Sequence, residues 1–173
     1  VSGVRELPRG IQLGLQGHEE RSGGRVTLKI ENCPDFESLP EGIQCPSGLI
    51  LSNLPKFREL PKGINSSFMC SLRNLPIETI PSDFHFGDGV HGYLILEGLQ
   101  NLKTIPKCIF KPYITMMIQN CGVEALPEGL VVQSLVLMDL PNLESLPEGC
   151  KVAGDLEISG CQNLTLMPKS LRV

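Results

Sequence analysis

The stretch Leu143–Leu164, LESLPEGCKVAGDLEISGCQNL, contains one unit of a repeat that runs through most of the chain. Its clearest mark is an aliphatic residue followed by proline. At one phase of the repeat this pair occurs at Leu7-Pro8, Leu39-Pro40, Leu60-Pro61, Ile80-Pro81, Ile105-Pro106, Leu126-Pro127, Leu146-Pro147 and Met167-Pro168. From Pro40 onward the prolines of these pairs are separated by 21, 20, 25, 21, 20 and 21 residues. Such a period predicts a solenoid, in which each unit is one turn stacked on the last.

A triplet of the form apolar-x-apolar lies upstream of each proline from Pro40 onward and predicts a short strand with one buried face. The triplets begin at Leu28, Leu49, Cys70, Leu94, Met116, Leu135 and Leu156. Two residues after each triplet stands a residue that tolerates left-handed backbone, which predicts the end of the strand. These residues are Asn32, Asn53, Asn74, Gly98, Asn120, Asp139 and Gly160.

The aliphatic-proline pair predicts the path between strands. Proline fixes φ, lacks an N–H and pushes the preceding residue into extended geometry, so a helix cannot continue across it. We therefore expect a β/coil solenoid, with a parallel sheet on the concave face and an extended or polyproline-like convex side. Residues 1–173 form one repeat domain of about seven full units and two partial ones. The last residues, 171–173, occupy the phase at which another unit would begin, which predicts a piece of a longer array whose ends could self-associate.

Two insertions interrupt the period, near residues 14–24 and 84–92. The glycines and charges of the first predict a surface loop. In the second, Asp88-Gly89 is a turn signal, and we expect a small protrusion that makes a minor contact with a partner. His85, Asp88 and His91 are alternative candidates for metal ligands. A short polar loop accounts for them more simply, so no metal site is predicted.

The seven cysteines include no C-x-x-C pair. Three of them, Cys33, Cys121 and Cys161, share one phase of the repeat with leucines of the other units. That alternation favours small buried apolar side chains over a zinc site or a disulfide framework. Free thiols in this number favour a reducing compartment.

Composition and motifs argue against several classes of function. The net charge of −4, the scattered Lys and Arg, and the absence of Trp disfavour nucleic acid as a partner. No apolar run is long enough to predict a membrane span. We find no catalytic pairing of Ser, His, Asp or Cys and no glycine-rich phosphate loop. Neither an enzymatic activity nor a cofactor is therefore predicted within this chain.

The residues of each strand that point away from the core predict a binding surface. Because Tyr93, Ile95, Met117, Val136 and Met138 should adjoin one another, the middle of the concave face is expected to be apolar within a polar rim, as is common at protein-binding sites. The alternatives are that parallel strands favour β-branched residues even on exposed faces, and that a neighbouring domain covers the patch. The candidate partner-binding residues are Ile50, Arg73, Tyr93, Ile95, Glu97, Met117, Gln119, Val136, Met138 and Glu157.

The unit Leu143–Leu164 resembles a leucine-rich repeat of the short bacterial class, with Leu-Pro in each turn. Where many such repeats carry a buried Asn, this chain has Cys33, Leu54, Leu75, Leu99, Cys121, Leu140 and Cys161, so we expect apolar contact there instead of an asparagine ladder. Chains with this repeat are similar to type III secretion effectors. The resemblance implies recognition of a host protein in the host cytosol, and in some members an attached ubiquitin-ligase domain.

Two alternatives remain open beside this expectation. The chain could be the substrate-recognition part of a larger enzyme, such as an effector ubiquitin ligase, whose catalytic domain lies outside it. It could also be an extracellular adhesion or structural array, which the unpaired cysteines disfavour.

Overall fold

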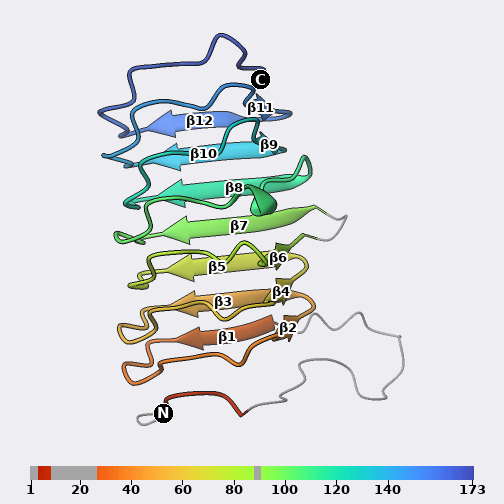
Figure 1. The fold of residues 1–173 in the computed structure, drawn as a ribbon, viewed down its shortest axis with the longest axis vertical. Coiled ribbons are helices and arrows are strands. Elements are labelled where there is room, and N and C mark those ends of the chain that lie inside the picture. Colours follow the sequence, from red (N-terminus) through yellow and green to blue (C-terminus); the bar gives the residue numbers. More distant parts are fainter. Residues whose placement is uncertain (1–3, 9–26, 88–90) are drawn as a thin grey trace.

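A computed structural model describes residues 4–8, 27–87 and 91–173. The chain winds as a solenoid whose successive turns stack along one axis (Figure 1). One strand from each turn contributes to a seven-stranded sheet in the order β1-β3-β5-β7-β8-β10-β12, and all neighbours are parallel. The strands are β1 (Thr27–Glu31), β3 (Gly48–Ser52), β5 (Met69–Arg73), β7 (Gly92–Glu97), β8 (Ile114–Gln119), β10 (Ser134–Met138) and β12 (Leu156–Ser159).

The predicted β/coil solenoid is confirmed, and each predicted triplet lies inside one strand of this sheet. The predicted alternation is also present, because the outer residues of each triplet point into the core. Leu94 and Leu96 of β7, for example, are almost completely buried, whereas Ile95 between them is only partly covered. The leucines of successive turns form one continuous apolar core along the stack.

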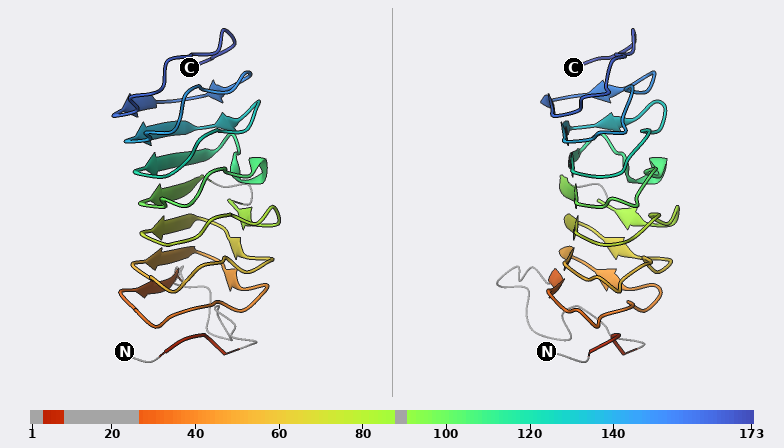
Figure 2. Two further views of the ribbon diagram at one scale, coloured as in Figure 1. Left: turned by 60° about the vertical axis from the view of Figure 1, so that its left-hand side comes forward. Right: turned by 90° about the vertical axis from the view of Figure 1, so that its left-hand side faces the viewer.

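The side away from the seven-stranded sheet contains paired short strands that the sequence did not predict (Figure 2). The strands β2 (Gln44–Cys45), β4 (Asn65–Ser66) and β6 (His85–Phe86) form one parallel set, and β9 (Val131–Val132) pairs with β11 (Lys151–Val152). These short strands form because the chain is extended between the strands of the large sheet, as the sequence predicted. Extended segments at the same phase of adjacent turns bring N–H and C=O groups together, as in Lys151 N–H donating to Leu130 O at 2.9 Å. The 3₁₀ turn η1 (Lys107–Ile109) is the single helical element among the described residues.

The residues predicted to end the strands all have left-handed backbone, with φ between 49° at Asn74 and 67° at Gly98. Glycines two residues after proline have it as well, for example Gly42 at φ 68°. The turns that contain Gly42, Gly63, Gly129 and Gly149 therefore have two corners in this conformation, which non-glycine residues other than Asn and Asp adopt only at a cost.

Cys121 confirms the predicted burial of the cysteine phase, since it lies in the core and its Sγ donates to Gln119 O at 3.2 Å. Cys33 and Cys161, near the two ends of the stack, are only partly buried. All seven cysteines are free thiols. Burial raises the pKa of Cys45 to about 11 and also raises the pKa of Cys121, so both thiols are neutral at pH 7.

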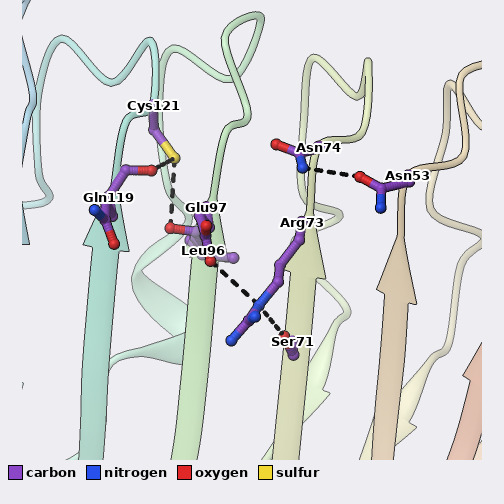
Figure 3. Close-up of polar contacts among 8 residues, drawn as sticks. All are labelled: Asn53, Ser71, Arg73, Asn74, Leu96, Glu97, Gln119 and Cys121. Carbon is purple, nitrogen blue, oxygen red and sulfur yellow. Dashed lines mark hydrogen bonds and ion pairs between the residues drawn. The ribbon is translucent and has the colours of Figure 1, made fainter. Parts of the chain in front are cut away.

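A ladder of exposed asparagines runs along the corner after β1, β3 and β5. Asn53 Nδ2 donates to Asn32 Oδ1 at 2.8 Å. Asn74 Nδ2 donates in turn to Asn53 Oδ1 at 2.8 Å (Figure 3). An asparagine ladder was expected to be absent from the buried phase one residue later, and leucine or cysteine indeed fills that phase. The sequence contains a signal for this exposed ladder, because Asn occupies the same repeat position in three successive turns.

The ladder gives a prediction at Asn53, which both donates and accepts. Asn53→Ala should lower the free energy of unfolding by about 1–3 kcal/mol, because it removes two exposed hydrogen bonds and places alanine in left-handed backbone. Asn53→Gly loses the same bonds without the backbone penalty and should cost about 1 kcal/mol less. Urea unfolding of both variants measures the difference. Equal costs would contradict the assigned role of the backbone.

The structure describes only part of the two insertions, and the predicted turn at Asp88-Gly89 lies outside the described residues. The first insertion lies outside the described residues. The described part of the second does not protrude, because Phe84 and Phe86 are buried in the core and Phe86 belongs to β6. Because Phe84 and Phe86 alternate with exposed His85 and both point into the core, this segment packs onto the preceding turn, where β6 pairs with β4. Asp88 lies outside the described residues, and His85 and His91 are exposed.

Candidate partner-binding surface

The outward side chains of β7, β8 and β10 form the apolar surface that the sequence predicted. Ile95, Met117 and Val136 are register partners on these strands, and Tyr93 and Met138 lie two residues along β7 and β10. We call these five residues the apolar patch. Tyr93 is 49% exposed, whereas the other four are only partly exposed because in-register neighbours shelter one another. The patch therefore exposes less apolar surface than five free side chains would.

Phe68, which the repeat pattern did not single out, supports Tyr93. The two rings lie 5.9 Å apart in an edge-to-face arrangement, and Tyr93 N–H donates to Phe68 O at 2.9 Å. Such aromatic pairs are favoured by about 0.5–1.5 kcal/mol beyond the area they bury. The contact holds the most exposed side chain of the patch in a fixed direction. Its sequence signal was an aromatic residue directly before a strand, beside the tyrosine of the next turn.

Arg73 and Glu97 bound the patch on the side of β5. Arg73 Nε donates to Ser71 Oγ at 3.1 Å and lies 3.3 Å from Glu97 Oε2 (Figure 3). Ser71 is the register partner of Ile95 on β5 and is only 3% exposed. The row of apolar residues therefore stops at β7, because the next strand, β5, places Ser71 and the charged Arg73 beside it. Ile50 lies on the same face but two strands from Ile95, with Ser71 between them.

Acidic residues bound the patch on the side of β12. Glu157 is the register partner of Val136, and Asp155 lies two residues before it; both are exposed. Neither has an ion-pair partner among the described residues, in contrast to Glu97 with Arg73. Gln119 completes the rim as the register partner of both Glu97 and Met138. The sequence placed the candidate residues in the correct rows, and the structure adds that the two ends of the patch differ in charge balance.

The side chains of this surface offer apolar and polar contacts. Within the part of the chain that the structure describes, no group of three His, Cys, Asp or Glu side chains could hold a metal ion. In the same residues, no helix is long and apolar enough to cross a membrane. The surface presents apolar side chains, the hydroxyl of Tyr93 and a polar rim.

Comparisons with known proteins give no relative. No protein-family model matches the chain, and no curated protein or solved structure matches it at a significant level.

Proposed function

We propose that this chain is a protein-recognition module that binds a partner through the apolar patch. The observation that supports the proposal best is the row of three apolar side chains in register, Ile95, Met117 and Val136, which Tyr93 and Met138 flank on the same sheet face within a polar rim. An apolar patch of this kind is a common mark of an interaction site. A solenoid supports the same interpretation, because stacked turns present an extended surface.

The finer proposal is that the module is a leucine-rich repeat of a secreted bacterial effector and that its partner is a host protein in the host cytosol. The Leu-Pro repeat supports this proposal. The buried, neutral thiols are compatible with a reducing compartment. Recognition by such a module would depend on the variable outward residues and not on the repeated leucines, which are in the core.

A site-specific photo-crosslink tests the proposal. A photo-reactive amino acid at Gln119, on the rim of the patch, should capture a partner from eukaryotic cell lysate under reducing conditions. The same group at Thr79, an exposed residue before Ile80-Pro81 and outside the sheet, is the matched control and should not capture it. Mass spectrometry identifies the captured protein. Capture from both positions alike, or from neither, would contradict the proposed surface.

Affinity for the captured partner gives the quantitative prediction. Met117→Glu and Val136→Lys should each weaken binding at least tenfold, because each loses about 1.5–3 kcal/mol of apolar burial and places a charge in the contact. Glu124→Lys, an exposed change outside the sheet, should leave the dissociation constant within about twofold. Titration calorimetry measures all three variants. Unchanged affinity in Met117→Glu would exclude the apolar patch as the binding surface.

A further inference from the structure

We infer that the segment of the partner that contacts the apolar patch is an amphipathic α-helix, which crosses β7, β8 and β10 and places a Lys or Arg side chain over Glu157. This inference rests on the proposed function and specifies the chemistry of the partner.

The first argument concerns the backbone of the partner. The strands under the patch are interior strands, so the sheet already pairs their N–H and C=O groups on both sides. A partner strand could add only at an edge, β1 or β12, and not on this face. An extended segment lying on the patch would bury its own backbone groups without partners, which is costly. A helix satisfies its backbone internally and buries only side chains.

The second argument concerns the shape of the patch. Its centre is a single row, Ile95-Met117-Val136, with one residue from each strand. Thr115 and Ser134 border this row on one side, and Glu97 and Gln119 border it on the other. A second sheet packed face to face would need several apolar rows, whereas a helix presents one apolar stripe.

The spacing of the row also fits a helix. Neighbouring strands are about 4.8 Å apart and a helix rises about 5.4 Å per turn, so side chains at i, i+4 and i+7 meet three successive strands. Tyr93 and Met138 lie on opposite sides of the row and at opposite ends of it. They are therefore placed to contact the two flanks of such a helix.

The third argument concerns charge. At the β5 end of the row, Arg73 is already neutralised by Glu97 at 3.3 Å. At the β12 end, Glu157 and Asp155 are exposed and have no ion-pair partner among the described residues. Glu157 is one strand beyond Val136, so position i+11 of the helix lies above it. A basic residue there adds little affinity but fixes the direction and register of the helix.

Two matched peptide libraries test the inference. In both, positions i, i+4, i+7 and i+11 of a displayed peptide are randomised; the first has a helix-forming framework and the second has prolines between these positions, which prevent a helix. Selection uses the wild-type chain, with Met117→Glu as the counter-selection target. Fluorescence anisotropy then gives the dissociation constants of the enriched peptides for wild type, Glu157→Lys and the control Glu124→Lys.

The expected result is enrichment from the helical library alone, with apolar residues at the first three positions and Lys or Arg at i+11. Glu157→Lys should weaken these peptides about two- to fivefold, and a Glu at i+11 should restore the affinity for that variant. Enrichment of proline-containing peptides that depend on Met117 would overturn the helix and leave the proposed function intact. No charge preference at i+11, or no effect of Glu157→Lys, would overturn the assigned register.

Failure of both libraries would also count against the inference. If the crosslink at Gln119 still captured a partner whose binding depends on Met117, only the helical partner would be excluded. If that crosslink failed too, the proposed function itself would be excluded.

Discussion

Replacing Leu96 with alanine is expected to lower the free energy of unfolding by about 2–5 kcal/mol, whereas Ile95→Ala, one residue earlier, should cost only about 1 kcal/mol. The two residues are adjacent on β7, in the middle of the seven-stranded sheet. Leu96 is fully buried, so its truncation leaves a cavity between turns. Ile95 points out of the sheet and is only partly covered, so its truncation leaves no enclosed space.

The position of Leu96 in the stack adds to the effect. Each turn of a solenoid contacts only its neighbours, so a weakened central turn uncouples the two halves of the array. Ile158→Ala in β12, where the side chain is only partly buried, should therefore cost less than Leu96→Ala. Urea unfolding followed by circular dichroism measures the three variants. Equal losses for Ile95→Ala and Leu96→Ala would contradict the assigned directions of these side chains.

The features of the fold that depend on one turn could be predicted from the sequence. Proline at a fixed phase, alternation as in Leu94-Ile95-Leu96 and a turn former such as Gly98 each act within a few residues. The fixed period also predicted the parallel sheet, but other contacts between turns were not predicted. The pairing of β9 with β11 and the bond from Asn74 to Asn53 require the rise between turns, which no single unit encodes.

The candidate site shows the same division. The repeat phase placed Tyr93, Met117 and Val136 on one face, because the side-chain direction follows from alternation. The exposed fraction of each of these side chains could not be predicted from the repeat phase. Neighbours on adjacent strands cover each side chain by an amount that depends on the residues of other turns. The contacts of Arg73 with Ser71 and Glu97 likewise depend on a rotamer and not on the phase. Sequence therefore predicted the rows of the surface, and the structure was needed for its boundaries.

Gly122 is the position at which a small change should have the second large effect. A Cβ atom there would lie 2.0 Å from the backbone oxygen of Gln100 in the preceding turn. The N–H of Gly122 also donates to Leu99 O at 3.0 Å, which holds the two turns together. In this unit a single residue separates Cys121 from the next core residue, Val123, whereas two residues separate Leu99 from Leu102. Because this connection is one residue shorter, the backbone at Gly122 lies directly against Gln100 of the preceding turn.

Gly122→Ala is therefore expected to cost about 3 kcal/mol, at the upper end of the range for overpacking, because a backbone atom cannot rotate away. Gly42→Asn is the control. Gly42 has φ 68°, a Cβ atom added there would meet no atom within 4 Å, and Asn occupies the same backbone region at Asn32 and Asn53. The control should cost less than about 1 kcal/mol. Thermal and urea unfolding compare the two variants. A Gly122→Ala protein as stable as the control would show that adjacent turns can separate, which the continuous hydrogen bonding between them argues against.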